Sequence, residues 1–207
     1  MKIIYKYVVL LMSLILLSGC AATSLKPLSQ QNKQSIKAIA IDDHVKVPVD
    51  MYYVGPGLGY LMLTGIVGDA IAAGQNSQES KKLKALAENN NIHIDKIVKD
   101  NMMKEIKENT SLKIVPIESA DAVMNIEIQK YGLSIPTGYA TSVEPILVVN
   151  AKLVKDNQVV WKDGYYVSPS NMPKHKIGEI ENNPVLLAQL WNMAAEKAVQ
   201  HIIRTLN

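Results

Sequence analysis

The sequence predicts a two-layer domain of the α/β (α+β) class, in which helices pack on one face of a mixed sheet. Several segments alternate between apolar and polar residues, as strands do, and two longer segments repeat apolar residues at the spacing of an amphipathic helix. The predicted order along the chain is strand, helix, two strands, a strand pair and a helix. That order is typical of two layers built around one core.

Three segments indicate the first strands. Residues 35–42 are apolar on both faces, as expected of a buried central strand. Residues 112–117 form a short apolar run, and residues 120–135 alternate cleanly between apolar and polar side chains. The alternation predicts a strand with one buried face.

A strand pair follows. Residues 145–154 turn through residues 155–157 into residues 158–167, which predicts a hairpin. Asp163 and Gly164 on the return strand indicate a break or bulge, because glycine inside a strand often marks one.

Two segments have helical period. In residues 91–110, apolar residues recur every four positions, and lysines and glutamates occupy the opposite side. Residues 185–206 carry a second apolar stripe. Asn183 is the expected N-cap of this helix, with Pro184 at its first position.

The first nineteen residues are typical of a secretory signal peptide. Lys2 and Lys6 make a basic start, and residues 8–17 form an uncharged apolar core. A membrane-spanning helix needs about 20 apolar residues. The apolar run is therefore too short for a permanent span.

The end of this segment resembles a bacterial lipobox, since Leu17, Ser18, Gly19 and Cys20 match its pattern at every position. The resemblance implies that the Cys20 thiol receives a diacylglycerol, that residues 1–19 are removed, and that an N-acyl chain such as palmitate is added. Two or more acyl chains anchor a protein stably. The alternative is an ordinary signal peptide with an incidental cysteine. No cofactor is expected besides this covalent lipid.

The residues after Cys20 predict location and domain limits. Ala21 is not the aspartate that resembles an inner-membrane retention signal in Gram-negative bacteria, which favours the outer membrane and a domain facing the periplasm. Residues 20–34 are small and polar and are predicted to be a flexible tether. Residues 35–207 then form one α/β domain.

Charge and cysteine content exclude several classes. The formal net charge is +3, and removal of Lys2 and Lys6 lowers it to +1, so no basic patch suggests a nucleic-acid partner. Cys20 is the one cysteine of the chain. Once it is lipidated, the domain has no disulfide to stabilise it in an oxidising compartment.

Residues 52–74 are an unusual apolar insertion that contains one charged residue, Asp69. Its glycines are Gly55, Gly57, Gly59, Gly65, Gly68 and Gly74. One interpretation is a turn followed by a closely packed helix over residues 60–73. A second is an interaction surface, on which these small residues pack against a copy of the chain or the lipid surface. A third is a membrane-inserting element formed on assembly.

Catalytic and metal-binding patterns do not stand out. The histidines, His44, His93, His175 and His201, are scattered, and no two have helical metal-ligand spacing. No G-x-S-x-G segment occurs. We therefore expect neither an enzyme nor a metal site.

Two motifs carry a further resemblance. Ala120-Asp121-Ala122 opens a strand, and the segment from Lys155 to Trp161 closes a hairpin. With the lipobox and the C-terminal helix, they make the chain resemble small Gram-negative envelope lipoproteins whose domain is similar to the TolB amino-terminal domain and the curli-secretion lipoprotein. Neisserial surface lipoproteins look similar too. The resemblance implies the α/β fold, and no site residue is carried over from it.

These observations support two hypotheses. The first is an outer-membrane lipoprotein that acts as a binding or assembly module for envelope or secretion machinery, with a protein partner. The alternative is a homo-oligomeric secretion or pore component like the curli exporter, with residues 52–74 as its assembly or membrane element.

Overall fold

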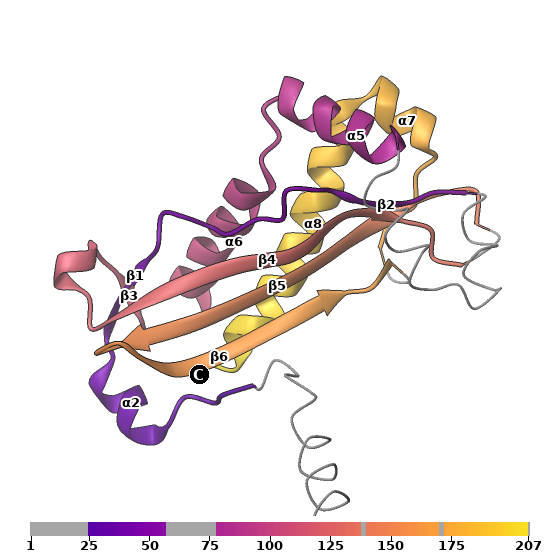
Figure 1. Cartoon of the computed structure of the whole chain (residues 1–207). Coiled ribbons are helices and arrows are strands. Elements are labelled where there is room, and N and C mark those ends of the chain that lie inside the picture. Colours follow the sequence, from indigo (N-terminus) through magenta and orange to yellow (C-terminus); the bar gives the residue numbers. More distant parts are fainter. Residues whose placement is uncertain (1–24, 57–77, 138–139, 170–171, 207) are drawn as a thin grey trace, which may run out of the picture.

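The computed structural model describes residues 25–56, 78–137, 140–169 and 172–206. These residues form a mixed sheet whose one face is covered by α6 (Ile94–Asn109) and α8 (Pro184–Arg204), as Figure 1 shows. The predicted two-layer α/β architecture is confirmed. Its core lies between the sheet and these two helices.

The sheet has six strands in the order β3-β1-β4-β5-β6, and β2 pairs with the far part of β4. Their bounds are β1 (Ala38–Ile41), β2 (Tyr52–Val54), β3 (Lys113–Ile114), β4 (Ala122–Ser134), β5 (Glu144–Lys155) and β6 (Gln158–Val167). β1 is parallel to β3 and β4, whereas β4, β5 and β6 are antiparallel. All the strands expected from the sequence are present, although β3 is shorter than residues 112–117.

β1 and β2 lie one after the other along the same edge of β4. β1 pairs with β4 at Ala122–Met124, and β2 pairs with it at Gly132–Ser134. Between them the chain touches β4 through an isolated parallel bridge from Lys46 to Glu127. The sheet edge on this side is therefore interrupted. The strand character of residues 52–54 was not expected within the glycine-rich stretch.

The β5–β6 hairpin turns through Asp156 and Asn157, which have φ of 50° and 60°. Two left-handed residues are what a two-residue hairpin turn of type I′ requires. The predicted bulge at Asp163 and Gly164 is wrong. The register shift lies at Val160, between Val159 and Trp161, and Gly164 stays in register opposite Asn150.

β4 contains a second register shift, at Gln129. The extra residue changes the phase of the alternation, so that Ile128 and Tyr131 both face the helices. Tyr131 packs edge-on against Trp191 of α8, with ring centroids 5.5 Å apart. This shift is what brings a tyrosine into the core.

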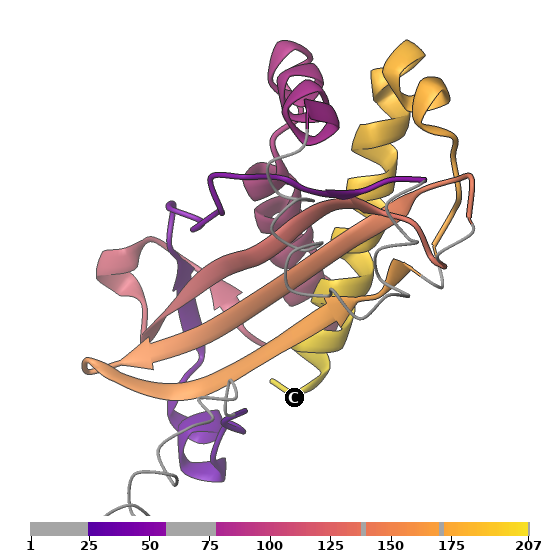
Figure 2. The same ribbon diagram turned by 45° about the vertical axis from the view of Figure 1, so that its right-hand side comes forward.

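The helices begin and end near their expected positions. The predicted apolar stripe of α6 is buried, and Pro184 occupies the start of α8, where the side chain of Asn183 makes no capping hydrogen bond. Four short elements were not expected: α2 (Gln30–Ser35), α5 (Gln78–Asn89), η1 (Ile117–Ser119) and α7 (Ile177–Asn182). Figure 2 shows α5 and α7 at the opposite end of the molecule from α2.

The N-terminal segment departs from the expected domain boundary. Lys26 pairs with Lys162 of β6 through two backbone hydrogen bonds of 2.8 and 2.9 Å, and Leu28 is buried. The described fold therefore includes residues 25–34, which were expected to be tether. An apolar residue and a free strand edge explain the docking. Residues 20–24 lie outside the described residues.

Candidate functional site

Most of the site residues expected from the sequence lie outside the described residues. They are Leu17, Ser18, Gly19, Cys20, Gly57, Gly59, Gly65, Gly68 and Gly74. Gly55 is described, and it is buried directly after β2. A Cβ atom there would lie 2.2 Å from the Tyr53 hydroxyl oxygen. At Gly55, the glycine thus permits close packing against a tyrosine.

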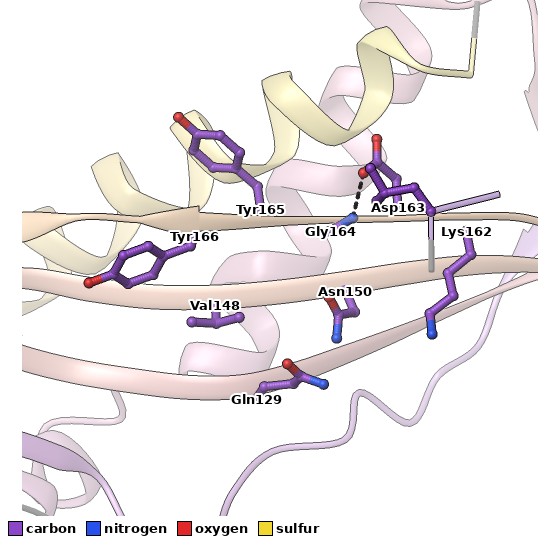
Figure 3. Close-up of a pocket in the computed structure, with 9 residues that line it drawn as sticks. Gln129, Val148, Asn150, Lys162, Asp163, Gly164, Tyr165 and Tyr166 are labelled. Carbon is purple, nitrogen blue, oxygen red and sulfur yellow. Dashed lines mark hydrogen bonds between the residues drawn. The ribbon is translucent and has the colours of Figure 1, made fainter. Parts of the chain in front are cut away.

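The sheet face opposite α6 and α8 (Figure 1) is here called the open face. It carries polar side chains of β4, β5 and β6. They include Asn125, Asn150, Lys152, Lys162 and Tyr166. Figure 3 shows Gln129, Asn150 and Lys162 on this side of the strands, with Asp163 and Tyr165 directed toward the helices. A small cavity of about 180 Å³ lies among these open-face side chains.

Gly164 shapes this cavity. A Cβ atom on Gly164 would lie 2.1 Å from Oδ1 of Asn150, so the glycine lets the Asn150 side chain lie across β6. Asn150 is largely buried. Its side-chain amide group makes no hydrogen bond with another described residue. The glycine expected to mark a bulge instead makes room for a cross-strand neighbour.

Three lysines follow one another across the open face. Lys152 lies opposite Lys162 in the β5–β6 ladder, and Lys162 lies opposite Lys26 in the bridge to the N-terminal segment. Residues opposite each other in antiparallel strands present their side chains on the same face. We call Lys26, Lys162 and Lys152 the lysine row. Among the described residues, no carboxylate forms an ion pair with any of them.

A larger cavity opens at the interrupted edge. This edge cleft, of about 540 Å³, is lined by residues 43–49, by α5 and the start of α6, and by Tyr131 and Trp191. The indole nitrogen of Trp191 is buried and has no hydrogen-bond partner among the described residues. The Tyr131 hydroxyl also makes no hydrogen bond with a described residue. Buried polar groups are normally paired, so such groups mark a candidate binding site.

The edge cleft is lined by more acids than lysines, with Asp43, Glu88 and Asp95 against Lys46 and Lys84. Burial raises the pKa of Tyr131 to about 12, and the carboxylates of Glu88, Asp50 and Asp95 add to the rise. Lys84 is engaged on the rim, where its ammonium donates to the Val49 carbonyl at 2.7 Å. The cleft therefore favours a cationic or neutral ligand over an anion.

Asp43, at another part of the rim, is paired with Lys99 at 2.6 Å. The hydrogen bond from Lys99 and its positive charge lower the pKa of the Asp43 carboxyl. The residues 42–44 thus form an exposed turn tied to α6, in which the Asp42 carboxylate accepts a hydrogen bond from the His44 amide at 3.0 Å.

Two buried acids have structural partners. Glu144 is fully buried; it accepts a hydrogen bond from the Met172 amide at 3.3 Å and lies 3.6 Å from the Lys174 ammonium. Asp163 accepts a hydrogen bond of 2.6 Å from the Thr205 hydroxyl, which in turn accepts from the Trp161 indole at 3.2 Å. These contacts hold a loop and the end of α8 on the sheet.

The motif Ala120-Asp121-Ala122 also has a structural role. The Asp121 carboxylate accepts hydrogen bonds from the backbone amides of Lys37 and Ala38 at 2.8 and 2.9 Å, where β1 begins. These bonds lower the pKa of the Asp121 carboxyl. The resemblance through this motif therefore concerns strand assembly.

The histidines are not brought together. His201 stacks on Tyr165, and Nδ1 of His175 lies 3.3 Å from the Glu179 carboxylate. Within the described ranges, no group of three or more His, Cys, Asp or Glu side chains is arranged to hold a metal ion. The helices of the same ranges also include none with the length and apolar character needed to cross a membrane.

No protein-family model matches the chain, and no curated protein matches it. Several solved structures are similar. A Xanthomonas campestris protein of family DUF330 is 12% identical, with 87% of each chain covered and a TM-score of 0.45. A PelC dodecamer from Paraburkholderia phytofirmans is 11% identical over 84% of this chain and 87% of that chain, with a TM-score of 0.37.

A lipoprotein of Neisseria meningitidis is 15% identical, with 74% of this chain and 98% of that chain covered and a TM-score of 0.26. These neighbours include a lipoprotein and a dodecamer. At such TM-scores the likenesses carry no argument for this chain, so its function has to be argued from its own residues.

Proposed function

We propose that this chain is a lipid-anchored lipoprotein of the cell envelope, held at the outer membrane through Cys20, whose domain is a binding and assembly module for a protein partner in the periplasm. The observation that carries the proposal is the position of the edge cleft. It lies at the sheet edge opposite β6, the strand on which the N-terminal segment docks. The docked segment around Lys26 and the cleft thus lie at opposite edges of the sheet.

The edge cleft has the properties of a recognition site. Its volume of about 540 Å³ lies within the range of ligand-binding pockets. Tyr131 and Trp191 line it, and among the described residues neither the Tyr131 hydroxyl nor the buried Trp191 indole nitrogen has a hydrogen-bond partner. A partner segment that offers backbone carbonyls and a Lys or Arg side chain matches these groups and the nearby carboxylates of Glu88 and Asp95.

Binding fits these residues better than catalysis. The cleft holds His44 and His93, but neither is hydrogen-bonded through its ring to a serine, a threonine or an acid among the described residues. A nucleophile that is activated by an adjacent histidine base needs such a pair. We therefore assign the chain a non-enzymatic role without a cofactor other than the lipid.

In-cell photo-crosslinking tests this function. A photoreactive residue replaces Val49, which is 79% exposed on the rim of the cleft, and in a control chain replaces Met193, which is 43% exposed on α8. We expect a defined cross-linked product from position 49 that is absent from position 193. Tyr131→Phe should weaken it, because this change removes only the hydroxyl. Equal cross-linking at both positions would contradict the assignment.

The cross-linked product also distinguishes the two hypotheses about the partner. A product containing another envelope protein supports the binding module. A product containing two copies of this chain instead supports the homo-oligomeric secretion or pore component. In that case light scattering of the detergent-extracted protein should give a large mass, and Gly65→Leu with Gly68→Leu should reduce it.

Mass spectrometry tests the anchor independently. The mature protein should begin at Cys20 and carry the mass of a diacylglycerol and an acyl chain, and Cys20→Ser should retain the signal segment. A mature chain without lipid would overturn the proposed location.

A further inference from the structure

We propose that the β6 edge and the adjoining open face dock on anionic phospholipid headgroups of the membrane that holds the chain. The inference rests on the proposed lipid anchor at Cys20. It adds a defined orientation, in which the lysine row faces the membrane and the edge cleft faces away from it.

The chain between Cys20 and the fold is short. If residues 20–34 were a free tether, Cys20 could lie as much as about 50 Å from Ser35 at full extension. Because Lys26 is paired with β6, the chain that joins Cys20 to the fold ends at Leu25 and spans at most about 18 Å. The β6 edge is therefore held within a short distance of the headgroups.

The second argument is the lysine row itself. Like charges directly opposite one another on neighbouring strands destabilise a sheet. Lys26, Lys162 and Lys152 have this arrangement, and the Lys26 ammonium donates to a neutral group, the Val159 carbonyl. The ammonium groups of Lys152 and Lys162 have no partner among the described residues. A surface of phosphate groups supplies the negative charge that this row lacks.

The acids of the open face do not cancel this charge. Glu127 is paired with Lys46 at 2.8 Å. Asp42 lies on the same side, where it lines a hollow together with Lys152 and Lys162. The open face thus carries Lys46 and the three lysines of the lysine row against these two acids, so its net charge is positive.

The third argument is apolar exposure beside the row. Leu25 is 68% exposed and Tyr166 is 52% exposed, and both line the cavity drawn in Figure 3. Tyrosine is enriched at membrane interfaces, where its ring lies among headgroups. Leu25 is the described residue nearest in sequence to Cys20.

On the helix-covered side, the described helix α6 carries charges of both signs. On α6, Lys96, Lys99, Lys104 and Lys107 are interspersed with Asp95, Asp100, Glu105 and Glu108. That face has mixed charge, and we expect it to remain in solvent. Its lysines provide a matched control for the lysine row.

The experiment uses the full-length lipidated protein reconstituted in vesicles. The Cys20 sulfur is alkylated in the mature lipoprotein and the chain has no other cysteine, so an introduced cysteine is its only free thiol. A fluorophore is attached at Gln129→Cys on the open face, or at Gln189→Cys on the exposed side of α8 as a control. Quenching by a headgroup-attached quencher is measured in phosphatidylethanolamine vesicles with and without phosphatidylglycerol.

We expect strong quenching at position 129 with phosphatidylglycerol, weaker quenching without it or at high salt, and little at position 189. One lysine close to an anionic surface contributes about fivefold in affinity, so Lys152→Gln with Lys162→Gln should lower the ratio of docked to undocked domain about 25-fold. Lys104→Gln with Lys107→Gln removes the same charge from α6 and should leave the ratio unchanged.

Equal quenching at positions 129 and 189, or equal effects of the two double substitutions, would overturn the docking surface. Failure of the anchor is distinguishable, because the protein would not float with the vesicles and Cys20 would react with the fluorophore. A protein that floats, carries its lipid and shows no quenching at position 129 would refute the docking alone.

Discussion

The two edges of the sheet differ in how they end. At one edge, Lys26 pairs with the outer side of the ten-residue strand β6. The backbone amide of Gly164 in β6 donates a hydrogen bond of 2.7 Å to the Asp163 carboxylate. At the other edge, β1 and β2 share the side of β4. Between them, residues 43–49 touch β4 through the bridge at Lys46 and form one wall of the edge cleft.

The two edges of this sheet are therefore closed in different ways. A long exposed strand edge invites pairing with other chains, so natural sheets cover or interrupt their edges. Here the covered edge joins the domain to its N-terminal segment, while the interrupted edge creates a cavity. If the two edges are independent, a substitution at one edge should leave the other edge intact.

The largest expected effect lies at the β6 edge. Trp161 is fully buried and its indole donates to Thr205 at 3.2 Å, so Trp161→Ala should lower the free energy of unfolding by about 3–5 kcal/mol. Denaturant unfolding of the full chain measures it. Tyr166→Ala, on the exposed side of the same strand, should change stability by less than about 0.5 kcal/mol. A similar loss in both would contradict this view of β6.

The next effect lies at the interrupted edge. Gly132 has φ of 145°, and a Cβ atom there would lie 1.8 Å from the Tyr52 carbonyl oxygen. Gly132→Ala should therefore displace β2 and cost about 2–3 kcal/mol. Hydrogen exchange should show lost protection in residues 52–54 with β6 unchanged.

The control for Gly132 is Gly178→Ala in α7, where no atom lies within 4 Å of an added Cβ. Stability should stay the same or rise slightly there, since alanine favours helix. If exchange accelerated equally at both edges after Gly132→Ala, the edges would not be independent.

A pH dependence is expected from the interrupted edge. The pKa of Tyr131 is raised from 10.0 to about 12, because burial disfavours the phenolate. The folded state then holds its proton more tightly than the unfolded state, so stability is complete below pH about 10 and falls as pH rises toward 12. The loss contributed by Tyr131 is on the order of 2 kcal/mol.

Unfolding free energies across this pH window measure the effect, and Tyr131→Phe should remove the part due to Tyr131. Tyr53, whose pKa burial raises to about 12, keeps a second contribution in that variant. A stability that is flat across the window in the unchanged chain would refute the prediction.

The smallest expected effect concerns the docked segment. Lys26→Pro removes the amide that donates to the Lys162 carbonyl, which should cost about 1 kcal/mol. Exchange of the Lys162 amide should accelerate, with β1 and β2 unaffected. Lys26→Gln keeps the backbone bonds and should leave that exchange slow. A change at β2 would indicate coupling between the edges.

Side-chain patterning predicted the sheet and its main helices well. Residues 158–167 alternate and follow a turn, and β6 has those limits; the apolar stripe of α6 is buried as expected. These elements depend on local periodicity, which one sequence displays directly. The same is true of Pro184 at the start of α8.

The rest depends on contacts between distant segments. Nothing local in the polar residues 25–34 indicates that Lys26 pairs with Lys162, because the strand edge it covers is far away in the sequence. Gly164 was expected to mark a bulge, because the local sequence does not show that Asn150 of a neighbouring strand fills the space beside it. The edge cleft was not predicted either, because Tyr131 reaches the helix side through the register shift at Gln129, which depends on pairing with β5.

If the chain is exported as proposed, the parallel pairing of β1 with β4 has a consequence for the order of events during export. The contact between Asp121 and the Ala38 amide joins residues 83 positions apart, whereas the β4–β5–β6 meander and α8 are continuous in sequence. Local contacts form faster than distant ones. A chain that crosses a membrane from its N-terminus therefore delivers β1 and β2 before any strand exists for them to join. We expect Cys20 to receive its lipid while the domain is unfolded, so that residues 25–28 find β6 only after the anchor is in place.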